Sequence, residues 1–155
     1  MKRPPLGRES FLDAIRTALA AVISMLLAKL LKLPEFYWAP ISTIVIIEST
    51  IDPLTISWQR FAGTAIGAAL GAGLATAFRP NMISYGLGVL LCGILCSVLR
   101  LDGAYRFAAI TLSIVVLIAH ARPPWIVASH RFVEVSLGIA VGLGTAIAWR
   151  RPSAA

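Results

Sequence analysis

The stretch SWQRFAGTAIGAALGAG, residues 57–73, holds one charged side chain, Arg60, at the start of a run of small apolar residues. Such a run is typical of a membrane helix, so a full charge beside it needs a physical reason. The pattern returns 71 residues further on as SHRFVEVSLGIAVGLG, residues 129–144, where Arg131 occupies the position of Arg60. Any interpretation of the chain must therefore explain two matching arginines.

The composition is that of an integral membrane protein. Of the 155 residues, 58% are hydrophobic and only 14% are charged, and the mean hydropathy is +0.83. Because so little polar surface cannot keep a domain in water, the lipid bilayer is the expected partner. The formal net charge of +7 would suggest nucleic acid in a soluble protein. Here the basic residues stand singly at the ends of apolar runs, as membrane anchors do, which excludes a nucleic-acid partner.

Six apolar runs predict an all-α integral membrane protein with six transmembrane helices. The runs cover residues 11–33, 37–47, 61–78, 83–99, 107–119 and 132–149. A spanning helix needs about 20 residues, so the six fill residues 11–150 and leave no room there for a soluble catalytic domain. Residues 1–10 and 151–155 are then short tails.

An even number of spans puts both termini on one side of the membrane. Nine of the fourteen Lys and Arg residues fall on that side and five on the other. Because cytoplasmic loops carry the excess of positive charge, both termini are predicted to be cytoplasmic.

The chain is predicted to consist of two related halves. Residues 60–79 and 131–150 agree at nine of twenty positions, including the Arg-Phe start and three glycines in register. Repeat 1 then covers about residues 11–79 and repeat 2 about 83–150, with three helices each. Since three is odd, the second repeat enters the membrane from the opposite side, which is the inverted topology of alternating-access transporters.

In such a repeat, Arg60 stands at the start of its helix near the cytoplasmic face, and Arg131 stands at the start of its helix near the outer face. At a helix N-terminus, unpaired N–H groups and the helix dipole favour an anion. Two positive entrances, one on each side, are what a path for a negatively charged solute needs. The alternative is that both arginines only anchor their helices in headgroups, and Glu134 offers Arg131 a partner one turn away.

Glycines at every fourth position form matching faces on the third and sixth predicted helices: Gly63, Gly67 and Gly71, and then Gly138 and Gly142. Such faces let helices approach closely, so we expect the two helices to meet along them or across a dimer axis. A narrow pore lined by backbone is the alternative. Glu134 replaces the first glycine of the second face, and it is expected to point into the protein because a carboxylate facing lipid is costly.

The second and fifth apolar runs are short and occupy corresponding places in the two halves. Short or proline-interrupted segments so placed are a sequence indication of a transporter site. Pro40 interrupts the first of them, where Ser42 and Thr43 can satisfy the backbone groups that it frees. Thr111 and Ser113 stand in the second. The alternative is that these hydroxyls only bond to their own helices.

The sequence contains no signature of an enzyme. No nucleophile motif, phosphate-binding loop or pair of catalytic carboxylates is found, so we predict no catalytic residues and no cofactor. Cys92 and Cys96 lie four apart inside an apolar run and are interpreted as small core residues. No metal site is predicted.

The segments YWAPISTIVIIEST, SWQRFAGTAIGAALGAG and HRFVEVSLGIAVGL, in this order and spacing, resemble the fusaric acid resistance (FUSC) and aromatic acid exporter family. The family's unit is called an integral membrane bound transporter domain, and the resemblance covers about residues 16–149. Members are similar to the plant aluminium-activated malate transporters. This implies a six-helix module that forms a homodimer around an anion path lined by arginines of the third and sixth helices, here Arg60 and Arg131. An efflux adaptor protein is a further partner that larger relatives suggest.

We therefore expect a module of the bacterial inner membrane that exports organic anions such as aromatic carboxylates. Arg60 and Arg131 are the predicted anion contacts, and Thr64, Ser42 and Glu134 are further candidates for binding the substrate. A passive anion channel is one alternative, with electrogenic flux uncoupled from protons. The other is a non-transporting accessory subunit of a membrane efflux complex, in which loss of charge at Arg60 leaves transport unchanged.

Overall fold

A computed structural model describes residues 8–78, 81–117 and 122–149 of the chain. Over these residues the fold is entirely helical, as predicted, with six α-helices and no β-strand. The elements are α1 (Arg8–Leu30), α2 (Trp38–Ile47), α3 (Pro53–Ala77), α4 (Met82–Val98), the short 3-10 helix η1 (Asp102–Ala104), α5 (Tyr105–Leu117) and α6 (Pro124–Ala148). Of the predicted tails, residues 151–155 and most of 1–10 lie outside the described residues. α1 begins inside the first tail.

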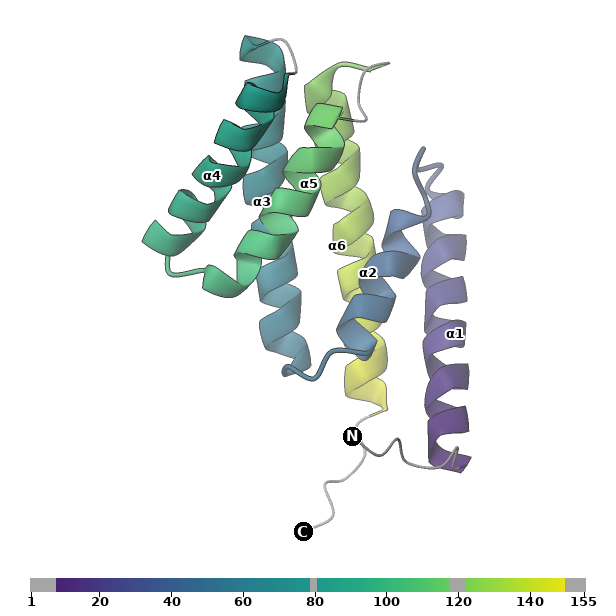
Figure 1. Ribbon diagram of the computed structural model, residues 1–155. Coiled ribbons are helices and arrows are strands. Elements are labelled where there is room, and N and C mark those ends of the chain that lie inside the picture. The colour runs from purple at the N-terminus through teal and green to yellow at the C-terminus, as the bar shows by residue number, and fades with distance from the viewer. Residues whose placement is uncertain (1–7, 79–80, 118–121, 150–155) are drawn as a thin grey trace.

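Successive helices run in alternating directions along the bundle (Figure 1). α1, α3 and α5 run one way, and α2, α4 and α6 run the other way. The start of α1 and the end of α6 consequently lie at the same end of the molecule. The first three helices therefore cross the bundle in the opposite sense to the last three.

Length and hydropathy together distinguish two candidate membrane spans among the described helices. α1, over Phe11–Leu30, and α6 are long and apolar enough to cross a membrane by length and composition. α2 and α5 have 10 and 13 residues, which makes them about 15 and 20 Å long, short of the roughly 30 Å of a hydrocarbon core. Turns at both ends limit α2 and α5 to this length, so the prediction of six transmembrane helices stays a prediction for these two.

α3 and α6 begin well before the apolar runs that predicted them. Both have 25 residues and start with a proline, Pro53 in α3 and Pro124 in α6, and proline suits the first helical position. Arg60 and Arg131 each lie seven residues into the helix. The prediction that they stand at helix N-termini is therefore wrong. Since the helix dipole acts mainly within the first turn, the two arginines must act through their own charge.

Asp52 caps the N-terminus of α3. Its Oδ2 atom accepts hydrogen bonds from the backbone N–H groups of Leu54 and Thr55, both at 3.1 Å. We expect Asp52→Ala to lower the free energy of unfolding by about 1 kcal/mol, because both N–H groups lose their acceptor. The thermal midpoint in detergent measures the effect, with Asp52→Asn as the control that keeps an acceptor. Equal midpoints for the two variants would contradict this role.

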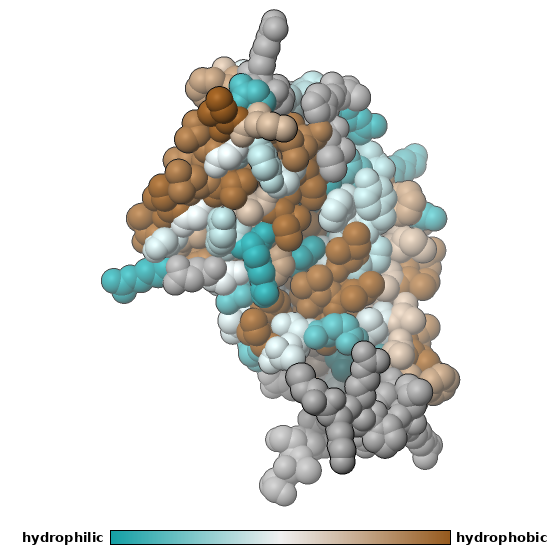
Figure 2. Space-filling model, in the orientation of Figure 1, coloured by the Kyte–Doolittle hydropathy of each residue, from teal (hydrophilic) through white to brown (hydrophobic). Residues whose placement is uncertain are grey.

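The core lies where α3 and α6 pack against each other and against the two short helices. α3 contacts α5 and α6, and α6 contacts α2 and α3. α1 packs mainly on α2 and α4 mainly on α5, so α1 and α4 form the two edges of the bundle. Large apolar side chains stay exposed on these edge helices, among them Phe11, Leu19, Leu30, Met82, Ile83 and Val98. Figure 2 shows those of α4 as a continuous apolar surface, which suits contact with lipid.

The two glycine faces pack against the short helices. A Cβ atom added at Gly67 would collide with the carbonyl oxygen of Ala108 in α5, and one added at Gly138 would collide with that of Ala39 in α2. The other glycines of these faces meet the same two helices: Gly63, Gly71 and Gly142. The prediction that the faces join α3 to α6, or one copy to another, is wrong because α5 and α2 already cover them. Contact between α3 and α6 includes Phe61 and Phe132, whose ring centroids are 5.0 Å apart.

α1 and α4 end in the same way. Lys32 and Arg100, just beyond the two helices, have φ angles of 53° and 55°. The backbone N–H of the following residue, Leu33 or Leu101, bonds back to a helix carbonyl at 3.0 or 2.7 Å. A left-handed residue of this kind closes a helix and starts a turn. Corresponding turns therefore lead into α2 and η1.

Candidate functional site

Arg60 and Arg131 approach each other from α3 and α6 and line one narrow cavity. Only 8% of Arg60 and 2% of Arg131 are exposed. The cavity measures about 20 Å³, which is room for about one water molecule. Its other lining residues come from α2, α3, α5 and α6: Trp38, Thr64, Phe107, Ile110, Thr111, Ile114 and Val135. Two cations at one cavity make it attractive to an anion, because a buried charge is costly without a partner.

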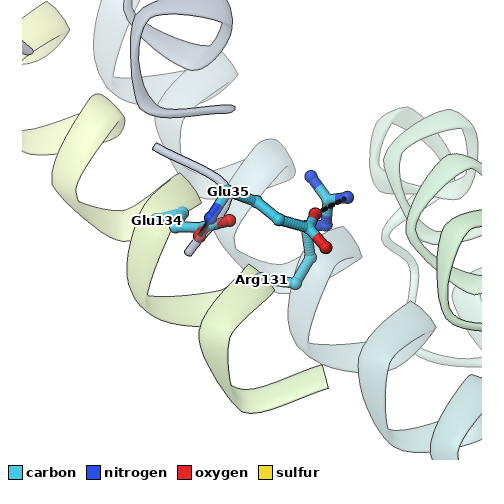
Figure 3. A network of polar contacts seen from close by, with 3 residues as sticks. All are labelled: Glu35, Arg131 and Glu134. Atoms are coloured by element: carbon cyan, nitrogen blue, oxygen red, sulfur yellow. Dashed lines mark hydrogen bonds and ion pairs between the residues drawn. The ribbon is translucent and has the colours of Figure 1, made fainter. Parts of the chain in front are cut away.

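Arg131 forms an ion pair with a residue distant in the sequence. Its Nη2 atom donates to Oε2 of Glu35 at 3.0 Å, in the turn between α1 and α2 (Figure 3). The guanidinium also lies over the ring of Trp38, 3.7 Å from its centroid, which is close enough for a cation–π interaction. The suggested pairing of Arg131 with Glu134, one turn along α6, is wrong. The charge of Arg131 is balanced by Glu35 instead.

Glu134 is fully buried, and its side chain binds the backbone of the same turn. Its Oε1 atom accepts a hydrogen bond from the backbone N–H of Glu35 at 2.9 Å. Figure 3 shows Glu35 extending from the carboxylate of Glu134 to the guanidinium of Arg131. Two side chains of α6 therefore fix one residue of the turn, one through its backbone and the other through its side chain.

Arg60 has a different environment. Its Nη2 atom donates to the Ser42 hydroxyl at 3.0 Å, and its guanidinium lies 5.1 Å from the Phe107 ring centroid. In the part of the chain that the structure describes, no carboxylate lies within 4.0 Å of this guanidinium. Arg60 thus brings an unbalanced positive charge to the cavity. Thr64, one turn further along α3, is 2% exposed and adds a hydroxyl to the lining.

Three residues of the site were missed by sequence reasoning: Glu35, Trp38 and Phe107. Trp38 and Phe107 each stand at the end of an apolar run, where an aromatic residue is equally typical of a membrane interface. Glu35 is an acidic residue in a turn, which is a common place for a solvated charge. The available signal was weak: a lone carboxylate beside an aromatic cluster in a chain where basic residues predominate.

The comparison with known protein families identifies the chain. A family model described as fusaric acid resistance protein-like matches residues 21–145. The chain belongs to this family. No curated protein and no solved structure matches it. Family membership and the apolar helices together indicate a membrane protein with a role in transport or resistance.

The matched segment of this fusaric acid resistance protein-like chain holds every residue of the cavity described above. A polar contact outside that cavity joins α1 to the end of α2, where Glu48 accepts a hydrogen bond from Thr17 at 2.6 Å. Within the described ranges, no group of three or more His, Cys, Asp or Glu side chains could hold a metal ion. The arginine cavity is therefore the strongest candidate site.

Proposed function

We propose that this chain is a transport module of the bacterial inner membrane that exports organic anions, with both termini in the cytoplasm. The observation that carries the proposal is the convergence of two buried arginines on one cavity, only one of which has a carboxylate partner among the described residues. Membership of the fusaric acid resistance protein-like family supports a transport role. The charge of the cavity supports an anionic substrate.

Matching contacts in the two halves support an inverted repeat. Arg60 lies over Phe107 of α5, and Arg131 lies over Trp38 of α2. In the same way, the glycines of α3 pack on α5 and those of α6 pack on α2. The helices of the two halves also run in opposite directions (Figure 1). We therefore propose two inverted three-helix repeats with the arginine cavity between them, as expected of alternating access.

The chemistry of the cavity favours a carboxylate attached to an aromatic body. A guanidinium binds carboxylates through directed, charge-assisted hydrogen bonds. The rings of Trp38 and Phe107 offer apolar surface beside the two guanidinium groups. Thr64 and Thr111 add hydroxyl groups that can orient an anion, and Ser42, which is not part of the lining, positions Arg60 by accepting its hydrogen bond. An aromatic carboxylate uses all three kinds of contact.

The size of the cavity favours a carrier over an open channel. A volume of about 20 Å³ admits about one water molecule and no organic acid. The described conformation is therefore closed, and transport requires the helices around the cavity to move apart. A carrier that opens alternately to each side meets this requirement.

The proposal is tested by anion flux in proteoliposomes that hold the purified chain. We expect saturable uptake of benzoate or another aromatic acid, faster than uptake of malate, and competition between them. Flux that is electrogenic, non-saturable and independent of a proton gradient would support the passive channel instead. A folded protein that moves none of these acids would contradict the proposal and favour an accessory subunit of an efflux complex.

The assembly is proposed to be a homodimer, with an efflux adaptor protein as a further partner. The apolar surfaces of α1 and α4 extend along both edges of the bundle, and lipid or a second copy can cover them (Figure 2). Native mass spectrometry from detergent gives the number of copies directly. A uniformly monomeric protein that still transports anions would contradict the homodimer.

A further inference from the structure

The ion pair between Glu35 and Arg131 has the chemistry of a bound substrate. A carboxylate oxygen lies 3.0 Å from a guanidinium nitrogen, and the guanidinium rests on an indole ring. Building on the proposed anion transport, we propose that Glu35 is a tethered stand-in for the substrate. The Glu35 carboxylate occupies the position at Arg131 that the carboxylate of a transported substrate takes. The substrate must therefore displace Glu35 in order to bind.

The exposure of the two partners sets the direction of approach. The Glu35 side chain is 30% exposed, whereas that of Arg131 is 2% exposed. An anion from outside the bundle therefore meets Glu35 before it meets Arg131. Like charges repel at this point, so an anion binds Arg131 only when the Glu35 carboxylate moves aside.

Arg131 has further hydrogen-bond donors for an incoming anion. Glu35 uses only the Nη2 atom, while Nε and Nη1 of Arg131 are buried and have no hydrogen-bond partner among the residues that the structure describes. A free carboxylate, which is not restrained by the backbone, can bond to two nitrogens of a guanidinium at once. The bidentate pair is stronger than the single contact that it replaces. The buried charge of Arg131 is balanced by Glu35 before the exchange and by the anion after it.

Displacement of Glu35 loosens the turn over residues 31–37. The turn is fixed to α6 through the side chain of Glu35 on Arg131 and through its backbone N–H on Glu134. Loss of the side-chain contact leaves one of these two hydrogen bonds. In the other half Gly63 replaces Glu134, and the carbonyl of Ala104 packs directly on it. Among the described residues, the anchor that Glu134 gives to its turn is therefore present in one half only.

The first test measures benzoate binding to the purified full-length chain by calorimetry. A tethered competitor acts at an effective concentration in the millimolar range, so we expect Glu35→Gln to lower the Kd for benzoate about tenfold or more. Glu48→Gln is the matched control, because Glu48 is a carboxylate that is hydrogen-bonded far from the cavity, and its Kd should equal that of the wild type. A Kd for Glu35→Gln that is unchanged or higher would overturn the proposal.

The second test remains informative if Glu35→Gln is unstable, since removing the partner of a buried arginine is destabilising. Sodium acetate, compared with sodium chloride, should raise the unfolding midpoint of Glu35→Gln more than that of the wild type or of Glu48→Gln. The acetate supplies the missing carboxylate at Arg131. An equal response of all three proteins would overturn the proposal.

These readouts separate the two proposals. Acetate rescue and tighter benzoate binding, together with no flux in the wild type, would support the carboxylate position at Arg131 and contradict transport. Normal flux together with no rescue and an unchanged Kd would support transport and contradict the role of Glu35.

Discussion

Replacement of Arg60 by alanine is expected to reduce benzoate flux about 100-fold, because a charge-assisted hydrogen bond contributes about 1.5–3 kcal/mol and each 1.4 kcal/mol is a factor of ten. The fold should survive the change. Arg60 has no carboxylate partner to leave unpaired within the described residues, and the Ser42 hydroxyl still donates to the carbonyl of Trp38 at 2.9 Å. Loss of a buried, unbalanced charge also removes a desolvation cost. The initial rate in proteoliposomes and the thermal midpoint measure the two effects.

Substitutions at two other arginines serve as comparisons for Arg60→Ala. Arg131→Ala should also abolish flux, but with a lower midpoint, because it leaves Glu35 and its turn without the ion pair. Arg106 is exposed and lies 4.7 Å from the same Phe107 ring that Arg60 contacts. Because exposed charges contribute little, Arg106→Ala should change the flux less than about twofold. Flux that persists in Arg60→Ala would exclude the anion path and leave Arg60 as a structural residue.

The second large effect is expected at the glycines that hold the short helices. Gly67→Ala places a methyl group against the carbonyl oxygen of Ala108, and Gly138→Ala does the same at Ala39. These neighbours are backbone atoms and cannot turn aside as a side chain can, so a whole helix must shift. We expect each substitution to lower the free energy of unfolding by about 3 kcal/mol or more, at the upper end of the usual cost of overpacking. Thermal unfolding and the yield of monodisperse protein measure this loss.

Gly73 and Gly144 are matched controls on the same two helices. A Cβ atom at either position meets nothing within 4 Å. Alanine there should be neutral or stabilising by up to about 1 kcal/mol, because it favours a helix more than glycine does. Equal losses at Gly67 and Gly73 would show that the close approach of α5 is not the cause. The glycine substitutions do not distinguish a transporter from an accessory subunit, because both need the fold. The Arg60 substitution does distinguish them.

Much of the helix plan was visible in the sequence, but the helix starts were not. Hydropathy marked the beginnings of α3 and α6 at Phe61 and Phe132, eight residues after the helices start at Pro53 and Pro124. The first eight residues of both helices include polar residues, among them Gln59 in α3 and His130 in α6, and these lower the local hydropathy. The proline at each start is the local signal that could have corrected this. The same error led to the prediction of helix-terminal arginines.

Some residues of the candidate site could be predicted from the sequence and others could not. Arg60, Arg131 and Glu134 could be selected from the sequence, because a charge in an apolar helix is costly and needs a reason. Glu35 could not, because it is separated from Arg131 by 96 positions and no periodicity links a turn to a helix so far away. Phe107 and Trp38 were also missed, since an aromatic residue at the end of an apolar run is equally typical of a membrane interface.

The sequence by itself determined the all-helical class, the repeated arginine–glycine segment and its pair of arginines, because these follow from local hydropathy and from a match in register. Only the tertiary structure decided what those residues contact. The glycines of α3 and α6 are covered by α5 and α2. Arg131 is balanced by Glu35, while Arg60 has no carboxylate beside it in the described part of the chain. The physical reason is that small side chains and buried charges specify that a close neighbour is needed, whereas the packing of distant segments specifies which neighbour it is.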